Sequence, residues 1–137
     1  MRAAFSVLFT LALTMAFAAV HADMKPQDNE LDAYAIFNDL SKADASKKAR
    51  EMAENDFANN VYRIFVVGKR PEKSAYDDYL KEHYGVLVTP IAGCLVSEGI
   101  IGAEQGYNST MKPSLNRKFG RDIFKEAEEA GRRQVER

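Results

Sequence analysis

The spacing of apolar side chains divides the chain into helical and extended segments. From residue 30 to 58 apolar positions recur every three or four residues, which predicts either one long bent helix or two shorter ones. Neither glycine nor proline interrupts this segment, and Asn59-Asn60 ends it. Candidate N-caps are Asp28 or Asn29 at the start and Ser41 or Asp44 at a break, and the apolar stripe consists of Ile36, Phe37, Leu40, Ala49, Met52, Ala53 and Phe57.

Two extended runs enclose a further helix. Residues 61–68 (VYRIFVVG) are nearly all β-branched or aromatic, as expected of a strand covered on both faces. Residues 86–94 (VLVTPIAGC) are expected to form the second strand. Between them, Ser74 is placed to cap a helix and Gly85 to end it. This order predicts a βαβ unit with two parallel strands and a right-handed crossover. Pro90 has no backbone donor, so the ladder ends there on at least one side or the strand is an edge.

The last third of the chain predicts helices. Ser97 is a candidate N-cap, and the apolar stripe that follows consists of Ile100, Ala103, Tyr107 and Met111. Pro113 is expected to kink or restart this helix. Asp122 is placed to cap a final helix with Ile123 and Ala127 facing inward. Residues 128–137 are almost wholly polar and are expected to fray as a charged tail.

These elements predict a helix-rich α/β fold in one domain over residues 30–127. Its centre is a small βαβ unit with two parallel strands, flanked by N- and C-terminal helices. Because two strands alone form a marginal sheet, an exposed strand edge could pair with a second copy, or helices could cover both edges. Nothing in the sequence specifies a symmetric partner, so we expect a monomer.

The N-terminal segment is typical of a secretory signal peptide. A positive start precedes the uncharged apolar run 5–20, and Val20-His21-Ala22 suits cleavage after Ala22. The run is shorter than the roughly 20 residues of a membrane span, which argues against a transmembrane anchor. We therefore expect removal of residues 1–22, a polar lead-in over 23–29 and a soluble periplasmic protein, with a eukaryotic secretory route as the alternative.

Charge and cysteine content narrow the function classes. The leader holds one of the 19 basic residues and none of the 20 acidic ones, so the mature chain is close to neutral. This balance lacks the basic character expected of a nucleic-acid-binding protein. The single cysteine cannot form an internal disulfide, so the core, an oligomer or an intermolecular bridge must stabilise the domain.

The carboxyl ends of the two predicted strands define a candidate ligand site. Lys69 and Arg70 follow the first strand, Cys94 ends the second run, and Ser97 opens the next helix. Ligands of open parallel sheets bind beyond the carboxyl ends of the strands. Two cations and a helix N-terminus would favour a carboxylate, sulfate or phosphate group there. The alternative interpretation is an ordinary solvated turn.

Cys94 has three interpretations. It can be a buried structural residue, half of an intermolecular disulfide, or a reactive thiol whose thiolate is stabilised by the following helix N-terminus. A nucleophile usually needs a nearby base. His83, the only histidine of the mature chain, precedes the second strand whereas Cys94 follows it, so we do not expect the two to meet.

Three glycines, Gly99, Gly102 and Gly106, fall on one flank of the predicted helix after Ser97. Each glycine inside a helix costs about 0.5–1 kcal/mol relative to alanine. Their presence therefore predicts a close-packing face for another backbone, in the same domain or in a second copy. A phosphate-binding loop is one alternative, although neither phosphate-loop signature matches, and an irregular loop is the other.

The remaining chemistry of the sequence is sparse. No His, Cys, Asp or Glu cluster has metal-ligand spacing, so we expect no metal and no cofactor. Asn108-Ser109-Thr110 fits a glycosylation sequon, which matters only in a eukaryotic host. We expect a non-enzymatic binding or interaction module for an anionic ligand or a protein partner. The alternatives are a small thiol-dependent or anion-binding enzyme centred on Cys94, Lys69 and Arg70, and a structural envelope component that self-associates through the glycine face.

Overall fold

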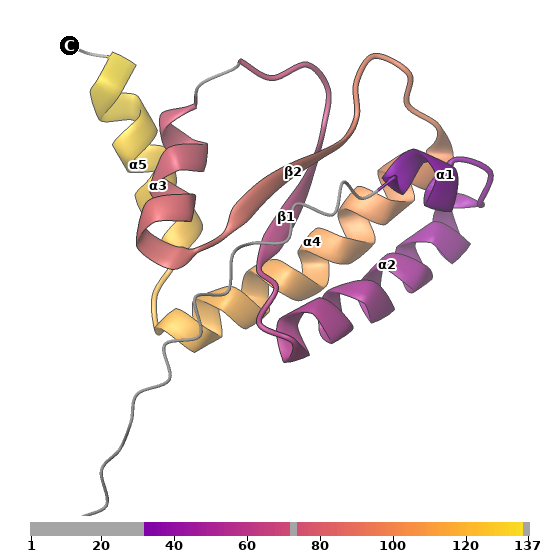
Figure 1. Ribbon diagram of the computed structural model, residues 1–137, viewed down its shortest axis with the longest axis horizontal. Helices are drawn as coiled ribbons and strands as arrows, with labels where there is room; N and C mark the ends of the chain where they lie inside the picture. Colours follow the sequence, from indigo (N-terminus) through magenta and orange to yellow (C-terminus); the bar gives the residue numbers. More distant parts are fainter. Residues whose placement is uncertain (1–31, 72–73, 136–137) are drawn as a thin grey trace, which may run out of the picture.

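The computed structural model describes residues 32–71 and 74–135. The predicted signal peptide, the polar lead-in and the candidate caps Asp28 and Asn29 lie outside these residues. In chain order the elements are α1 (Ala33–Phe37), α2 (Lys42–Ala58), β1 (Arg63–Val67), α3 (Ala75–Tyr84), β2 (Leu87–Ala92), α4 (Glu98–Phe119) and α5 (Ile123–Val135) (Figure 1). The helix-rich α/β fold class is confirmed.

The two strands pair in parallel, as the βαβ pattern predicts. Arg63 lies opposite Leu87 and Phe65 opposite Thr89. The N–H of Gly68 donates to the carbonyl oxygen of Ala92 at 2.9 Å, so both strands end at the same edge of the sheet. α4 lies against β1 with α2 on its outer side, whereas α3 and α5 pack together on the other side of the strands (Figure 1).

Pro90 lies on the free edge of β2. The N–H of Leu87 donates to the carbonyl oxygen of Tyr62, so the backbone groups of Leu87 point toward β1. Because these directions alternate along a strand, the backbone groups of residues 88 and 90 point away from β1. The missing donor of Pro90 is therefore on the side where this strand has no partner. The ladder consequently continues past Pro90 to Ala92, with an irregularity between Val66 and Val67.

The segment before β1 forms two helices, because the chain turns between Asn38 and Leu40. The carboxylate of Asp32 accepts from the N–H of Ala35 and caps the single turn of α1. The hydroxyl of Ser41 accepts from the N–H of Asp44 at 3.1 Å and caps α2. Asp44 thus lies inside the first turn of α2 and is not the cap.

The glycine flank of α4 packs on the backbone of α1 and α2. A Cβ at Gly99 would lie 1.9 Å from the carbonyl oxygen of Phe37. A Cβ at Gly102 or Gly106 would lie 2.2 Å from the carbonyl oxygen of Lys42 or Ser46, respectively. The close approach is therefore made within one chain, and α1 and α2 cover the glycine flank of α4.

The C-terminal helices differ from two expectations. α4 does not restart at Pro113 and continues through it to Phe119. Pro113 is exposed, so the carbonyl that loses its helical donor there lies near solvent. α5 is helical to Val135, through most of the stretch expected to fray. It packs along α3, and a Cβ at Gly131 would lie 3.9 Å from the backbone nitrogen of Tyr76.

The core lies where these elements meet. α4 contributes its predicted stripe and α2 contributes alanines, which allow the two helices to approach closely. The largest fully buried side chains are Tyr107, Phe37, Phe65, Ile64, Leu80, Ile100, Met111, Leu115, Ile123 and Val86. The core therefore spans both sides of the strands.

Candidate functional site

The basic turn after β1 is only partly available to a ligand. Lys69 is exposed, but the guanidinium of Arg70 pairs with the carboxylate of Asp77 in the first turn of α3. Burial raises the pKa of the neighbouring Tyr76 hydroxyl to about 12, with further contributions from the negative charges of Glu128 and Asp77. Arg70 therefore links the turn after β1 to the first turn of α3.

The loop after β2 exposes a free thiol and two large apolar side chains. Cys94 is exposed. Leu95 has 76% of its surface exposed and Val96 has 41%. The loop is fixed at its far end, because the hydroxyl of Ser97 accepts from the N–H of Ile100 at 3.3 Å and caps α4.

The structure brings some of the sequence-predicted residues together. Lys69 and Arg70 follow the end of β1, and Cys94 follows the end of β2, at the shared edge set by the Gly68–Ala92 hydrogen bond. Sequence reasoning missed Leu95 and Val96. The available signal was their position between the end of the strand and the N-cap Ser97. There, neither the helical nor the strand pattern of apolar residues predicts that they are buried.

His83 and Cys94 lie at opposite ends of β2. The six residues of this strand span about 20 Å at roughly 3.3 Å per residue. The exposed imidazole of His83 instead packs on Tyr79, with 4.2 Å between ring centroids. His83 therefore cannot serve Cys94 as a general base, which requires hydrogen-bond distance.

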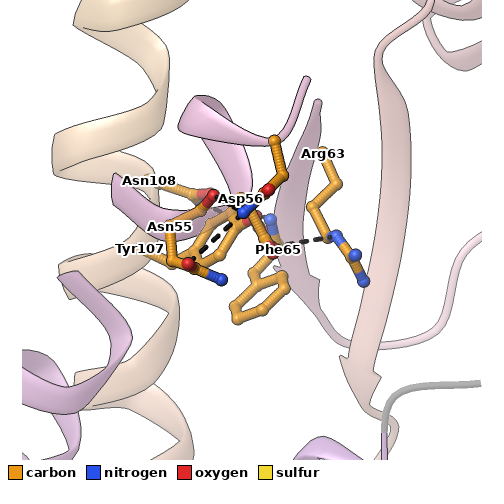
Figure 2. A network of polar contacts seen from close by, with 7 residues as sticks. Asn55, Asp56, Arg63, Phe65, Tyr107 and Asn108 are labelled. Carbon is orange, nitrogen blue, oxygen red and sulfur yellow. Dashed lines mark hydrogen bonds and ion pairs between the residues drawn. The ribbon is translucent and has the colours of Figure 1, made fainter. Parts of the chain in front are cut away.

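A polar network joins α2, β1 and α4 (Figure 2). The hydroxyl of Tyr107 donates to Asp56 Oδ2 at 2.6 Å, and Arg63 Nε lies 3.3 Å from the same oxygen without hydrogen-bond geometry. Burial, followed by the hydrogen bond with Asp56, raises the pKa of Tyr107. Tyr107 also stacks on Phe65, with ring centroids 3.8 Å apart. These contacts join α2, β1 and α4, so we assign the network a structural role.

Asn108 extends this network to the free edge of β1. Its side-chain oxygen accepts from the N–H of Phe65 at 2.9 Å, and its Nδ2 donates to the carbonyl oxygen of Phe65 at 2.7 Å. The nitrogen that glycosylation of the sequon would modify is therefore engaged in the fold. The sequence pattern gave no indication of this pairing.

The described residues contain no group of three or more His, Cys, Asp and Glu side chains arranged to hold a metal ion. Within the same ranges, none of the helices combines the length and apolar character that crossing a bilayer requires. Comparison with protein-family models, with curated proteins and with solved structures gave no match. Function is therefore inferred from the geometry of the described surface.

Proposed function

We propose that this protein is an exported, non-enzymatic binding module that contacts a protein partner through the loop Gly93–Val96. The supporting observation is the exposure of Leu95 and Val96 next to each other in a loop. Adjacent exposed apolar side chains favour burial against another surface. The cap at Ser97 holds the end of the loop in place, which lowers the entropy lost on binding.

Three further observations favour a protein partner over the alternatives. The charge of Arg70 is already met by Asp77, so an anion at Lys69, Arg70, Cys94 and Ser97 would rely mainly on Lys69 and the helix N-terminus. An enzyme based on Cys94 would lack His83 as its base. Self-association through the glycine face is disfavoured because α1 and α2 already cover that face.

An anionic ligand at the same edge remains the second candidate function. It is supported by the parallel strands, which place Lys69, Arg70 and Cys94 at one edge. A thermal-shift series with small anions tests it, since a ligand that binds only the folded state raises the melting temperature. An unchanged melting temperature, together with no effect of Lys69→Ala, would remove this candidate.

Export is proposed from the leader sequence alone. N-terminal sequencing of the protein isolated from its source cells tests it directly. A chain that begins at Asp23 supports export with cleavage after Ala22, whereas a chain that retains the apolar run would contradict it.

The partner surface can be tested by photo-crosslinking. A benzophenone maleimide attached to Cys94 is irradiated in an envelope extract of the source cells, and the adducts are separated by mass. We expect a discrete adduct that disappears in Leu95→Asp. The matched control carries the label at Glu82→Cys in a Cys94→Ser background, an exposed site on α3 beyond the other end of β2.

The possible adduct patterns distinguish specific binding from nonspecific crosslinking. A discrete adduct at Cys94, absent from both the control site and Leu95→Asp, supports the proposal. Identical adducts from both labelled sites, or no dependence on Leu95, would contradict it.

A further inference from the structure

We infer that a basic groove between α2 and α4 binds a ligand that carries two or more phosphoryl groups. The groove is lined by Lys42, Ala43, Ser46, Lys47 and Arg50 of α2 and by Gln105 of α4. None of these residues belongs to the loop Gly93–Val96, so the inference goes beyond the proposed function.

The glycine flank of α4 determines where this groove lies. Gly102 and Gly106 bring the backbone of α4 against the backbone of α2 at Lys42 and Ser46. Gln105, which directly precedes Gly106, then lies beside the side chains of α2. Larger residues at the two glycines would separate the helices and remove the shape of the groove.

The charges of the groove have one sign. Three of its six lining residues are cations and none is acidic. Among the described residues, the ion pairs involve Arg63, Arg70 and Arg121, so none forms at Lys42, Lys47 or Arg50 within 4 Å. At Lys42, the first residue of α2, the helix dipole also favours an anion.

Nearby groups orient the cations and limit the extent of the basic groove. Arg50 Nη2 donates to the hydroxyl of Ser46 at 3.1 Å, which orients the guanidinium along the groove. Asp44, the acidic residue in the first turn of α2, accepts a hydrogen bond from the hydroxyl of Ser41 at 2.6 Å and does not line the groove. Glu51 and Glu54 lie one turn beyond Lys47 and Arg50 on the same side of α2, so the basic segment ends at Arg50.

The donors of the groove identify the ligand class. Guanidinium and ammonium groups bind phosphoryl oxygens through charge-assisted hydrogen bonds, and the fork of arginine matches two such oxygens. A ligand with several phosphoryl groups can contact more of the three cationic side chains Lys42, Lys47 and Arg50 than a single phosphate can. The shared chemistry is therefore a row of phosphoryl groups, either in a soluble polyphosphorylated compound or on the headgroups of a phospholipid surface.

The test compares variants that remove the same charge from the same helix. Titration calorimetry measures binding of inorganic tripolyphosphate and of orthophosphate to the mature chain. We expect tripolyphosphate to bind more tightly, and Arg50→Gln or Lys47→Gln to weaken it about tenfold, as expected for loss of a hydrogen bond to a charged group. The control Lys48→Gln, exposed but outside the groove, should change affinity less than about twofold.

A second arm separates the two sources of phosphoryl groups. Co-sedimentation is measured with vesicles that contain phosphatidylglycerol in phosphatidylcholine and with vesicles of phosphatidylcholine alone. Binding of tripolyphosphate in solution indicates a soluble ligand, and binding confined to the anionic vesicles indicates a lipid surface. Either result supports the groove if Arg50→Gln abolishes it and Lys48→Gln does not.

Two results would overturn the inference. One is that neither tripolyphosphate nor anionic vesicles bind. The other is that Lys48→Gln weakens binding as much as Arg50→Gln, which would indicate diffuse charge attraction. Leu95→Asp should leave phosphate binding unchanged, so failure of the proposed partner surface and failure of the groove are distinguishable.

Discussion

The side-chain amide of Asn108 forms hydrogen bonds with both backbone groups of Phe65. Its oxygen accepts from the N–H and its nitrogen donates to the carbonyl, as the backbone of a neighbouring strand would do. A side chain of α4 therefore occupies the free edge of β1, while Pro90 interrupts the donors on the free edge of β2. Both edges of a two-stranded sheet are thus obstructed against the addition of a further strand.

Replacement of Asn108 should destabilise the fold. Asn108→Ala leaves the buried N–H and carbonyl of Phe65 unpaired, and the free energy of unfolding should fall by about 2 kcal/mol or more. Urea denaturation measures this change. Gln105→Ala, which removes an exposed amide from the same helix, is the control and should change stability by less than about 0.5 kcal/mol.

Asn108→Asp separates the two hydrogen bonds. The carboxylate still accepts from the N–H of Phe65 but faces its carbonyl oxygen, so this variant should also be destabilised at neutral pH. Protonation of the carboxyl group below about pH 4 restores a donor and should recover part of the loss relative to wild type. Equal stability of wild type and Asn108→Asp at neutral pH would show that the Nδ2 contact contributes nothing.

The same substitution should have opposite effects at two helical glycines. Gly102→Ala places a Cβ against the carbonyl oxygen of Lys42, and we expect a loss of roughly 1–3 kcal/mol. Gly131→Ala in α5 meets only an ordinary contact with Tyr76, so the higher helix propensity of alanine should stabilise the protein by up to about 1 kcal/mol. Thermal and urea unfolding of both variants measures the difference, and a stabilising Gly102→Ala would contradict the packing described for α4.

Ionisation of Tyr76 should make the fold less stable at high pH. Its pKa in the folded protein is raised from 10.0 to about 12, so between these values the unfolded chain loses its proton first. The free energy of unfolding should therefore keep this contribution below pH 10 and lose it progressively up to about pH 12. Tyr76→Phe should decline less steeply over this range than wild type, whereas Tyr34→Phe at an exposed side chain should follow wild type.

The local signals of the sequence predicted most of the elements. The predicted helix caps are confirmed at Ser74, Gly85 and Ser97. Capping depends only on the few residues around a helix end, so the local sequence predicts it. Parallel pairing followed from the length of the βαβ segment. These features required no knowledge of distant contacts.

Features that depend on tertiary packing could not be predicted. The pairing of Asn108 with Phe65 joins residues 43 positions apart, and no local pattern marks it. The ion pair of Arg70 with Asp77 joins the turn after β1 to α3, and no local pattern marks it. Pro113 was expected to interrupt α4, but burial of Met111 and Leu115 on either side of it holds the helix together. Exposure of Leu95 and Val96 likewise follows from the arrangement of the whole domain.

The most direct test of the proposed partner surface is the reactivity of the Cys94 thiol in the folded protein. Alkylation by iodoacetamide is followed by mass spectrometry for residues 23–137, the chain without the proposed leader, alone and in an envelope extract of the source cells. Glu82→Cys in Cys94→Ser serves as the reference thiol. The account predicts rapid labelling of the isolated protein and slower labelling of Cys94, but not of the reference thiol, in the extract. Labelling of Cys94 only after denaturation, or at the same rate with and without the extract, would contradict it.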